Sequence, residues 1–227
     1  MPFIEPVTLA GPSWVTLEPL DVGHEAGLRG AAIDGEGWNL WYTGVPEPDA
    51  VGAYIASALA MRRDQGALPF VARRKADGAV VGTTRFFHVD AANRRLEIGH
   101  TWYAQSARRT GINTEAKLLL LTHAFESLGC IAVEFRTHFF NFASREAIAR
   151  LGAKQDGILR SHQILADGSL RDTVVFSIIA PEWPAVRAHL LWQLARPRPP
   201  SRRRPAADLP LKSTMSPTGR IDAGPRK

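Results

Sequence analysis

A loop at residues 104–113 carries the residues whose types and spacing best suit the binding of a charged ligand. It follows a segment with a strand pattern and leads into the longest helical pattern of the chain. Backbone N–H groups at the start of a helix lack intrahelical partners and carry partial positive charge, so they attract phosphate groups. Gly111 lets a ligand approach the main chain closely, and Arg108 and Arg109 add cationic donors. The loop is therefore a candidate pyrophosphate site, although Thr110 as an ordinary helix cap beside two solvated arginines explains the same residues.

Three segments in the same order resemble the general N-acetyltransferase (GNAT) superfamily. The run RRTGIN at 108–113 is similar to the family's Q/R-x-x-G-x-G/A motif for acetyl-CoA. The run EIG at 97–99 lies where the family's fourth strand is expected. Downstream, NFAS at 141–144 followed by RLG at 150–152 resembles the N-x-x-S signature of the RimJ/RimL-like branch. The resemblance covers residues 12–182 and implies a GNAT-like fold.

This resemblance implies acetyl-CoA as the co-substrate. In the family, two splayed parallel strands admit the pantetheine arm and the start of the following helix takes the pyrophosphate. The residues implied to bind the cofactor are Arg108, Arg109, Thr110, Gly111, Ile112, Asn113 and Asn141. Asn141 has an equally good explanation as the Asx turn that starts a helix.

Direct transfer of an acetyl group to an amine needs a base for the amine and an acid for the departing thiolate. The resemblance implies Glu97 as the base, acting through water, and Ser144 as the acid. Two structural explanations compete with these roles. Glu97 can form an ion pair with Arg136 or Arg95 on a neighbouring strand, and Ser144 can be the cap of a helix that begins near residue 145.

Two positions depart from the family pattern. Asn113 stands where the motif usually has Gly or Ala, and Gln163 stands where RimL-like enzymes carry a second glutamate. His162, beside Gln163, can titrate near neutral pH and is a third catalytic candidate. The departures leave open an alternative function, a catalytically inactive GNAT-fold protein that binds acyl-CoA or regulates a partner.

Aromatic residues mark a candidate acceptor site. Trp38, Trp41 and Tyr42 lie in the turn-rich segment 37–48, where rings can form a rigid wall beside a ligand. Packing of the same rings into the core explains them equally well. The acceptor itself stays open among a protein N-terminus, an amino acid and a small amine.

The elements that must position these residues follow from hydrophobic periodicity and turn signals. The expected ranges are strand 14–20, helices 21–32 and 49–63, strands 68–75, 79–89 and 95–103, helix 110–128, strand 131–136, helix 144–151, strands 158–164 and 172–179, and helix 181–194. This order predicts an α+β fold with a mixed, mostly antiparallel sheet flanked by helices. Only the crossover from 95 to 137 requires two parallel strands, which the resemblance places, splayed, at the cofactor site.

The charge of the chain is concentrated at its C-terminal end. The chain of 227 residues has 28 Lys and Arg, 22 Asp and Glu and a net charge of +6. Residues 196–227 hold nine of the basic and two of the acidic residues, so the remainder is nearly neutral. We predict an acetyltransferase domain at 1–195 and a disordered, Pro- and Arg-rich tail at 196–227. An idle, solvated tail is favoured over one that contacts nucleic acid or the ribosome.

Several protein classes are excluded by composition. A single cysteine, Cys130, cannot form an internal disulfide or a cysteine-rich zinc site. The histidines show no metal-ligand spacing, so no metal is predicted. No apolar run reaches the roughly 20 residues that span a bilayer, and no signal-peptide pattern is visible. We expect a cytoplasmic monomer or homodimer without membrane contact.

Overall fold

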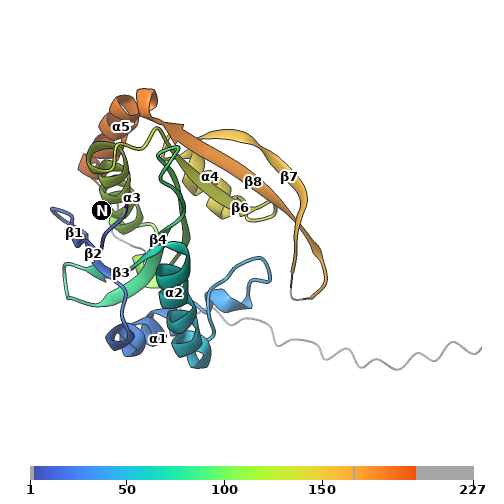
Figure 1. Ribbon diagram of the computed structural model, residues 1–227. Coiled ribbons are helices and arrows are strands. Elements are labelled where there is room, and N and C mark those ends of the chain that lie inside the picture. Colours follow the sequence, from blue (N-terminus) through green and yellow to red (C-terminus); the bar gives the residue numbers. More distant parts are fainter. Residues whose placement is uncertain (1–2, 166, 198–227) are drawn as a thin grey trace, which may run out of the picture.

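The structure is a computed structural model that describes residues 3–165 and 167–197, and a mixed sheet forms its centre (Figure 1). Within these residues eight strands lie in the order β1-β2-β3-β4-β5-β6-β8-β7. The strands are β1 (Leu9–Ala10), β2 (Val15–Pro19), β3 (Leu68–Arg74), β4 (Val80–Asp90), β5 (Arg95–Tyr103), β6 (Ala132–His138), β7 (Lys154–Ile164) and β8 (Leu170–Ile179). All neighbouring pairs are antiparallel except β5 and β6, which are parallel. The predicted fold class is confirmed.

Helices cover both faces of this sheet. They are α1 (Glu25–Ile33), α2 (Val51–Gln65), α3 (Ile112–Thr122), α4 (Phe142–Ala149) and α5 (Trp183–Ala195). Figure 1 shows α1 and α2 together on one side of the strands, and α3 and α5 on the other. Arg85 of β4 donates to the Tyr54 hydroxyl of α2 at 3.1 Å, whereas its neighbour Thr84 accepts from Lys117 of α3 at 3.3 Å. Adjacent residues of a strand point to opposite faces, so α2 and α3 cover different faces.

The parallel strands β5 and β6 pair over a short distance only. Their register runs from Arg95 opposite Ala132 to Glu97 opposite Glu134, and beyond that point both strands continue without pairing with each other. Two residues further along β5 a bulge begins, because β5 places one more residue than β4 between the pairs Arg85–Gly99 and Thr83–Trp102. A bulge bends and twists its strand. The two strands therefore diverge past Glu97, as the resemblance implied.

The expected elements occur in the expected order, with shifted ends. β1 was not predicted. The helix expected over 110–128 is present as α3, which is followed directly by a π-helical turn, His123–Ser127. The helix expected to start near residue 145 begins at Phe142, because the Asn141 side chain accepts a hydrogen bond from the Ser144 amide at 3.0 Å. The capping role considered for Ser144 was therefore wrong, and Asn141 is the cap.

Candidate active site

The start of α3 presents unpaired backbone donors, as expected for an anion site. Arg109 has a left-handed backbone with φ of 59°, which turns the chain into the helix. Among the described residues, no protein acceptor meets the backbone amides of Arg109, Thr110, Gly111 and Asn113. The Ile112 amide differs, since it donates to the Thr110 hydroxyl at 3.2 Å. Four of the five implied amides thus lack a protein acceptor in this part of the chain.

Gly111 plays a different part from the one expected. A Cβ atom at this position would lie 2.4 Å from the Trp14 indole, so the space beside the glycine is filled by protein. Trp14 is held in place because the buried Glu115 carboxylate accepts from the amides of Ser13, Trp14 and Val15 at 3.1, 2.6 and 2.8 Å. The absent side chain thus admits Trp14, whereas the sequence suggested that it admits a ligand.

The two arginines of the loop are both exposed but differ in their contacts. Arg108 donates from Nε to the Tyr103 carbonyl oxygen at 3.3 Å, which folds its side chain back over the end of β5. Arg109 has no hydrogen-bond or ion-pair partner in the part of the chain that the structure describes. Arg109 is therefore the more available cation of the pair.

The start of α4 supplies further polar groups. Asn141 uses Oδ1 for the helix cap, which confirms the Asx explanation. Its Nδ2 group and the Ser144 hydroxyl make no hydrogen bond to other described residues. Both side chains are half-buried. They are thus placed as donors that a ligand can meet.

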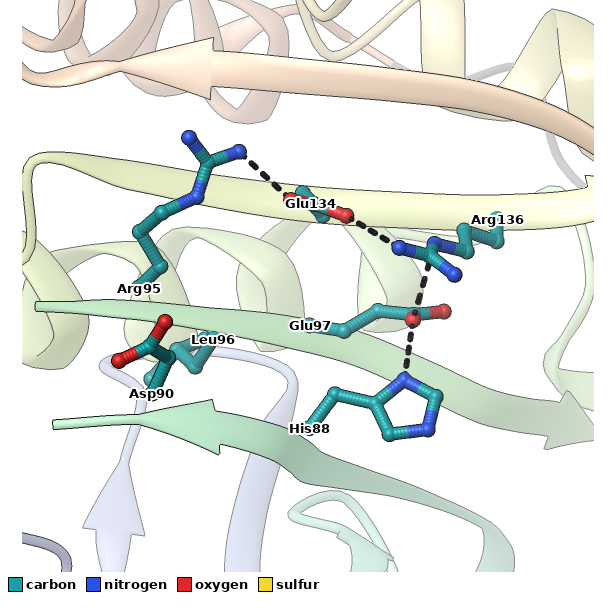
Figure 2. A pocket seen from close by; sticks show the side chains of 7 residues that line it. All are labelled: His88, Asp90, Arg95, Leu96, Glu97, Glu134 and Arg136. Carbon is teal, nitrogen blue, oxygen red and sulfur yellow. Dashed lines mark hydrogen bonds and ion pairs between the residues drawn. The ribbon is translucent and has the colours of Figure 1, made fainter. Parts of the chain in front are cut away.

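Glu97 lies where β5 and β6 begin to diverge (Figure 2). It is 3% exposed, its Oε2 is 2.9 Å from His88 Nδ1, and Arg136 Nε lies at 3.4 Å from the same oxygen. Burial raises the pKa of the Glu97 carboxyl, while the His88 hydrogen bond and the Arg136 charge act against that rise. The carboxylate is therefore able to take up a proton more readily than an exposed glutamate.

The neighbouring charges are arranged around a second glutamate (Figure 2). Glu134 accepts from Arg95 at 2.6 Å and from Arg136 at 2.9 Å. Burial acts to raise the pKa of Glu134, but the hydrogen bonds from Arg136 and Arg95 outweigh it and lower the pKa. Of the two alternatives weighed for Glu97, the contact with Arg136 is present and Arg95 binds Glu134 instead. A cavity of about 340 Å³ is lined by His88, Asp90, Arg95, Leu96, Glu97, Glu134 and Arg136.

The aromatic loop reaches the far end of β6. The Trp41 and Tyr42 rings lie 4.9 and 6.2 Å from the His138 ring, centre to centre. His162 is exposed on β7, with Nδ1 3.1 Å from the hydroxyl of Thr173. Thr173 pairs directly with His138. These residues gather at one end of β6.

That end is separate from Glu97. His138 lies four residues beyond Glu134, the partner of Glu97, which corresponds to roughly 13 Å along a strand. Glu97 and His162 are therefore not brought together as one catalytic group.

Trp38, unlike Trp41, is half-buried and packs against the hydrophobic core.

Two residues of this region were not predicted from the sequence: His88 and His138. The alternation along β6 places His138 on the face that Glu134 and Arg136 occupy, and this signal could have identified it. His88 reaches Glu97 through the irregular pairing of β4 with β5, for which the sequence carries no comparable signal.

The described residues offer neither a metal site nor a membrane-spanning helix. In residues 3–165 and 167–197, no group of three or more His, Cys, Asp or Glu side chains is arranged to hold a metal ion. None of the helices in that part of the chain combines the length and the apolar character needed to cross a bilayer.

Comparisons with known proteins agree on one family. The family model described as an acetyltransferase (GNAT) domain matches residues 15–154. "Putative ribosomal N-acetyltransferase YdaF" of Bacillus subtilis is 33% identical over 107 residues, which are 47% of this chain and 57% of that protein. The chain thus spans little more than half the length of the curated relatives it matches.

Solved structures match over more of the chain. A GCN5-related N-acetyltransferase from Brucella melitensis is 30% identical with a TM-score of 0.77, covering 86% of this chain and 88% of that one. Mycobacterium smegmatis RimJ in complex with CoA-disulfide is 25% identical with a TM-score of 0.69, covering 84% of this chain and 96% of that one.

Proposed function

The chain belongs to the GNAT acetyltransferase family, and from this premise we propose that it is an acetyl-CoA-dependent N-acetyltransferase acting on a primary amine. One observation carries the proposal. The pairing of β5 and β6 stops after Glu97 and Glu134, and the helix that connects these strands starts with backbone amides that have no acceptor within residues 3–165 and 167–197. Strand divergence beside an anion-attracting helix start suits a thioester on a pyrophosphate-bearing arm.

The residues at the start of α3 would hold the pyrophosphate of acetyl-CoA, which supplies the acetyl group as a thioester. The amides of Arg109, Thr110, Gly111 and Asn113 donate to its oxygens, and the Arg109 side chain adds charge. The free Nδ2 group of Asn141 is suited to donate to a carbonyl oxygen of the arm. The RimJ relative described with a CoA-disulfide supports this choice of co-substrate.

Glu97 is the proposed base. A primary amine is mostly protonated at neutral pH and must lose a proton before it attacks a carbonyl carbon. The buried Glu97 carboxylate takes up this proton, directly or through a water molecule. His88 is hydrogen-bonded to Glu97 and its side chain is 60% exposed, so it gives the proton a route to solvent.

Ser144 is the proposed acid for the departing thiolate. Its hydroxyl has no partner among the described residues and stands in the first turn of α4, just past the end of β6. His162 is the second candidate for the base. Because it lies far from Glu97, mutation of one residue leaves the other in place and shows which of them is the base. Trp41 and Tyr42 are the proposed wall of the acceptor site, and Trp38 supports it from the core.

The acceptor class proposed here is a protein N-terminus, with free amino acids and small amines as the other primary amines to be tested. The name of the YdaF relative supports a protein acceptor. We place the protein in the cytoplasm, as a monomer or homodimer, with a catalytic domain that ends with α5.

Release of free CoA thiol tests this function. The full chain is incubated with acetyl-CoA and a panel of amines that contains peptides with free N-termini, amino acids and polyamines. We expect thiol release that depends on at least one amine, with acetylated product detected by mass spectrometry. Acetyl-CoA binding without turnover across the panel would instead support the catalytically inactive alternative.

A further inference from the structure

His138 has a buried donor for which the described residues offer no acceptor. The residue is 3% exposed, and its Nδ1 accepts a hydrogen bond from the Phe140 amide at 3.1 Å. Because Nδ1 is an acceptor, the neutral ring carries its proton on Nε2. Nε2 is buried and has no partner among the described residues. Buried polar groups are nearly always hydrogen-bonded, so this donor calls for a partner beyond the described residues.

Arg171 presents a second unpaired donor on the adjacent strand. It lies on β8 two residues from Thr173, which pairs with His138, so Arg171 and His138 share one face of the sheet. Within the described ranges Arg171 Nε is buried without a partner, and no carboxylate there lies within ion-pair distance of the guanidinium. The nearest acid in sequence, Asp172, binds Arg160 and the Ser161 amide.

Arg171 acts electrostatically on both ends of the site. Burial and the positive charge of Arg171 lower the pKa of His138. Burial also lowers the pKa of Arg171 itself, and the negative charge of Glu97 acts against that change. The guanidinium therefore lies within electrostatic range of His138 on one side and Glu97 on the other.

The chemistry of this pair selects an anion. Both unpaired groups are donors and one is a permanent cation, so a carboxylate can satisfy both, whereas a cation or an apolar group leaves them unsatisfied. Around His138, the rings of Trp41, Tyr42 and Phe140 form an apolar surround, in which a charge-assisted hydrogen bond is strong.

We propose that His138 and Arg171 form a carboxylate-binding subsite for the acceptor, so that the preferred acceptor is an amine that also carries a carboxylate. The inference rests on the proposed function and narrows its substrate class. The carboxylate binds Arg171 and His138 while the amine points along the sheet toward Glu97, and its proton reaches Glu97 through water molecules because the two ends of the site lie roughly 13 Å apart along the strand. The carboxylate can belong to a free amino acid or to an acidic side chain near the N-terminus of a peptide.

Matched acceptor pairs test the subsite and separate these two sources. Alanine and alaninamide form the first pair, and the peptides Ala-Glu-Ala-Ala-Ala and Ala-Gln-Ala-Ala-Ala, both amidated at the C-terminus, form the second. We expect kcat/KM to favour the acid over its amide by roughly tenfold to a hundredfold in one pair, because a hydrogen bond to a charged group contributes that much. The favoured pair identifies the source.

Variants then assign the preference to the two residues. Arg171→Gln and His138→Phe should each reduce the acid-over-amide ratio toward one through KM for the acid, with KM for acetyl-CoA unchanged. Arg171→Lys keeps the charge and should retain most of the ratio. Arg187→Gln, on the exposed surface of α5, removes an arginine elsewhere and should leave the ratio unchanged. Thermal unfolding identifies any variant that fails to fold.

The outcomes distinguish this inference from the proposed function. Equal turnover of acids and amides by the wild type, or an acid preference that persists in Arg171→Gln, would overturn the subsite and leave the acetyltransferase intact. No thiol release with any amine would refute the proposed function itself.

Discussion

At the scale of the single residue, the site depends on how much proton affinity a carboxylate gains when it is buried. Glu97 and Glu134 pair with each other across β5 and β6, yet their pKa values shift in opposite directions. Glu134 is hydrogen-bonded to two arginines and is held as a carboxylate, whereas burial dominates at Glu97. Two neighbouring acids with diverging pKa values are a frequent arrangement where one of them transfers protons.

Replacement of Glu97 by Gln tests its role as the base. A base acts in its deprotonated form, and the pKa of Glu97 is raised above 4.5, so wild-type kcat/KM should fall as the pH drops through this raised pKa. Glu97→Gln should lower kcat by roughly 10²- to 10⁴-fold and remove that acidic limb from the pH profile. Asp90→Asn, in the same cavity, is the control. An unchanged pH profile in Glu97→Gln would indicate that His162 is the base instead.

At the scale of the element, α3 joins the cofactor loop to the sheet and carries an unusual buried group. Lys117 is 5% exposed and donates to Thr101 at 2.8 Å and to Thr84 at 3.3 Å, and no described carboxylate forms an ion pair with it. Burial lowers its pKa to about 7. In an unfolded chain a lysine has a pKa of about 10.4. The folded protein therefore disfavours the charged form of Lys117.

The stability of the fold should consequently depend on pH through Lys117. Between about pH 7 and pH 10 Lys117 binds more protons in the unfolded chain than in the folded protein, so the free energy of unfolding rises with pH. Below pH 7 the burial of the charged lysine destabilises the fold by its full amount. Lys117→Met should stabilise the protein at pH 6, by on the order of a few kcal/mol, and less at pH 9. Urea unfolding measures both, with the exposed Lys154→Met as control. An equal effect at the two pH values would contradict the shifted pKa.

The junction of the loop with α3 depends on packing between Gly111 and Trp14. Gly111→Ala places a methyl group 2.4 Å from the indole, so Trp14 must move and the loop with it. We expect weaker acetyl-CoA binding, measured by calorimetry, and a lower thermal midpoint. The double variant Gly111→Ala with Trp14→Leu should recover binding, because the smaller side chain makes room. Failure of this rescue would show that the glycine is needed by the ligand and not by Trp14.

The sequence predicts elements better than it predicts the contacts between them. Residues 95–103 were expected as a strand and form β5, because their alternation is strong and a turn precedes them. The start of α4 was misplaced by choosing Ser144 over Asn141, two capping residues three positions apart. Arg171 and His138 could not be paired from the sequence, because their proximity depends on the register of β8 against β6.

At the scale of the whole molecule, the positive charge and the catalytic fold occupy different parts of the chain. The family match ends at residue 154, and the described structure continues through α5 to residue 197. The predicted tail, 196–227, lies almost entirely outside the described residues. We keep the proposal that the catalytic domain ends at residue 195.

Truncation after Pro197 tests that domain boundary. The shortened chain should retain the thermal midpoint and the kcat/KM of the full chain, because none of the proposed site residues lies beyond that point. Co-sedimentation with ribosomes, compared between the two forms, examines the tail itself. A truncated chain that loses stability would place part of the domain within the removed segment.

The central claim is that the main-chain amides at the start of α3 bind the pyrophosphate of acetyl-CoA. Amide hydrogen exchange, followed by mass spectrometry with and without CoA, tests this claim most directly. Saturating CoA should slow exchange in the peptide that covers residues 109–113, together with the diverging part of β5. Saturation with CoA that leaves the exchange of residues 109–113 unchanged would contradict it.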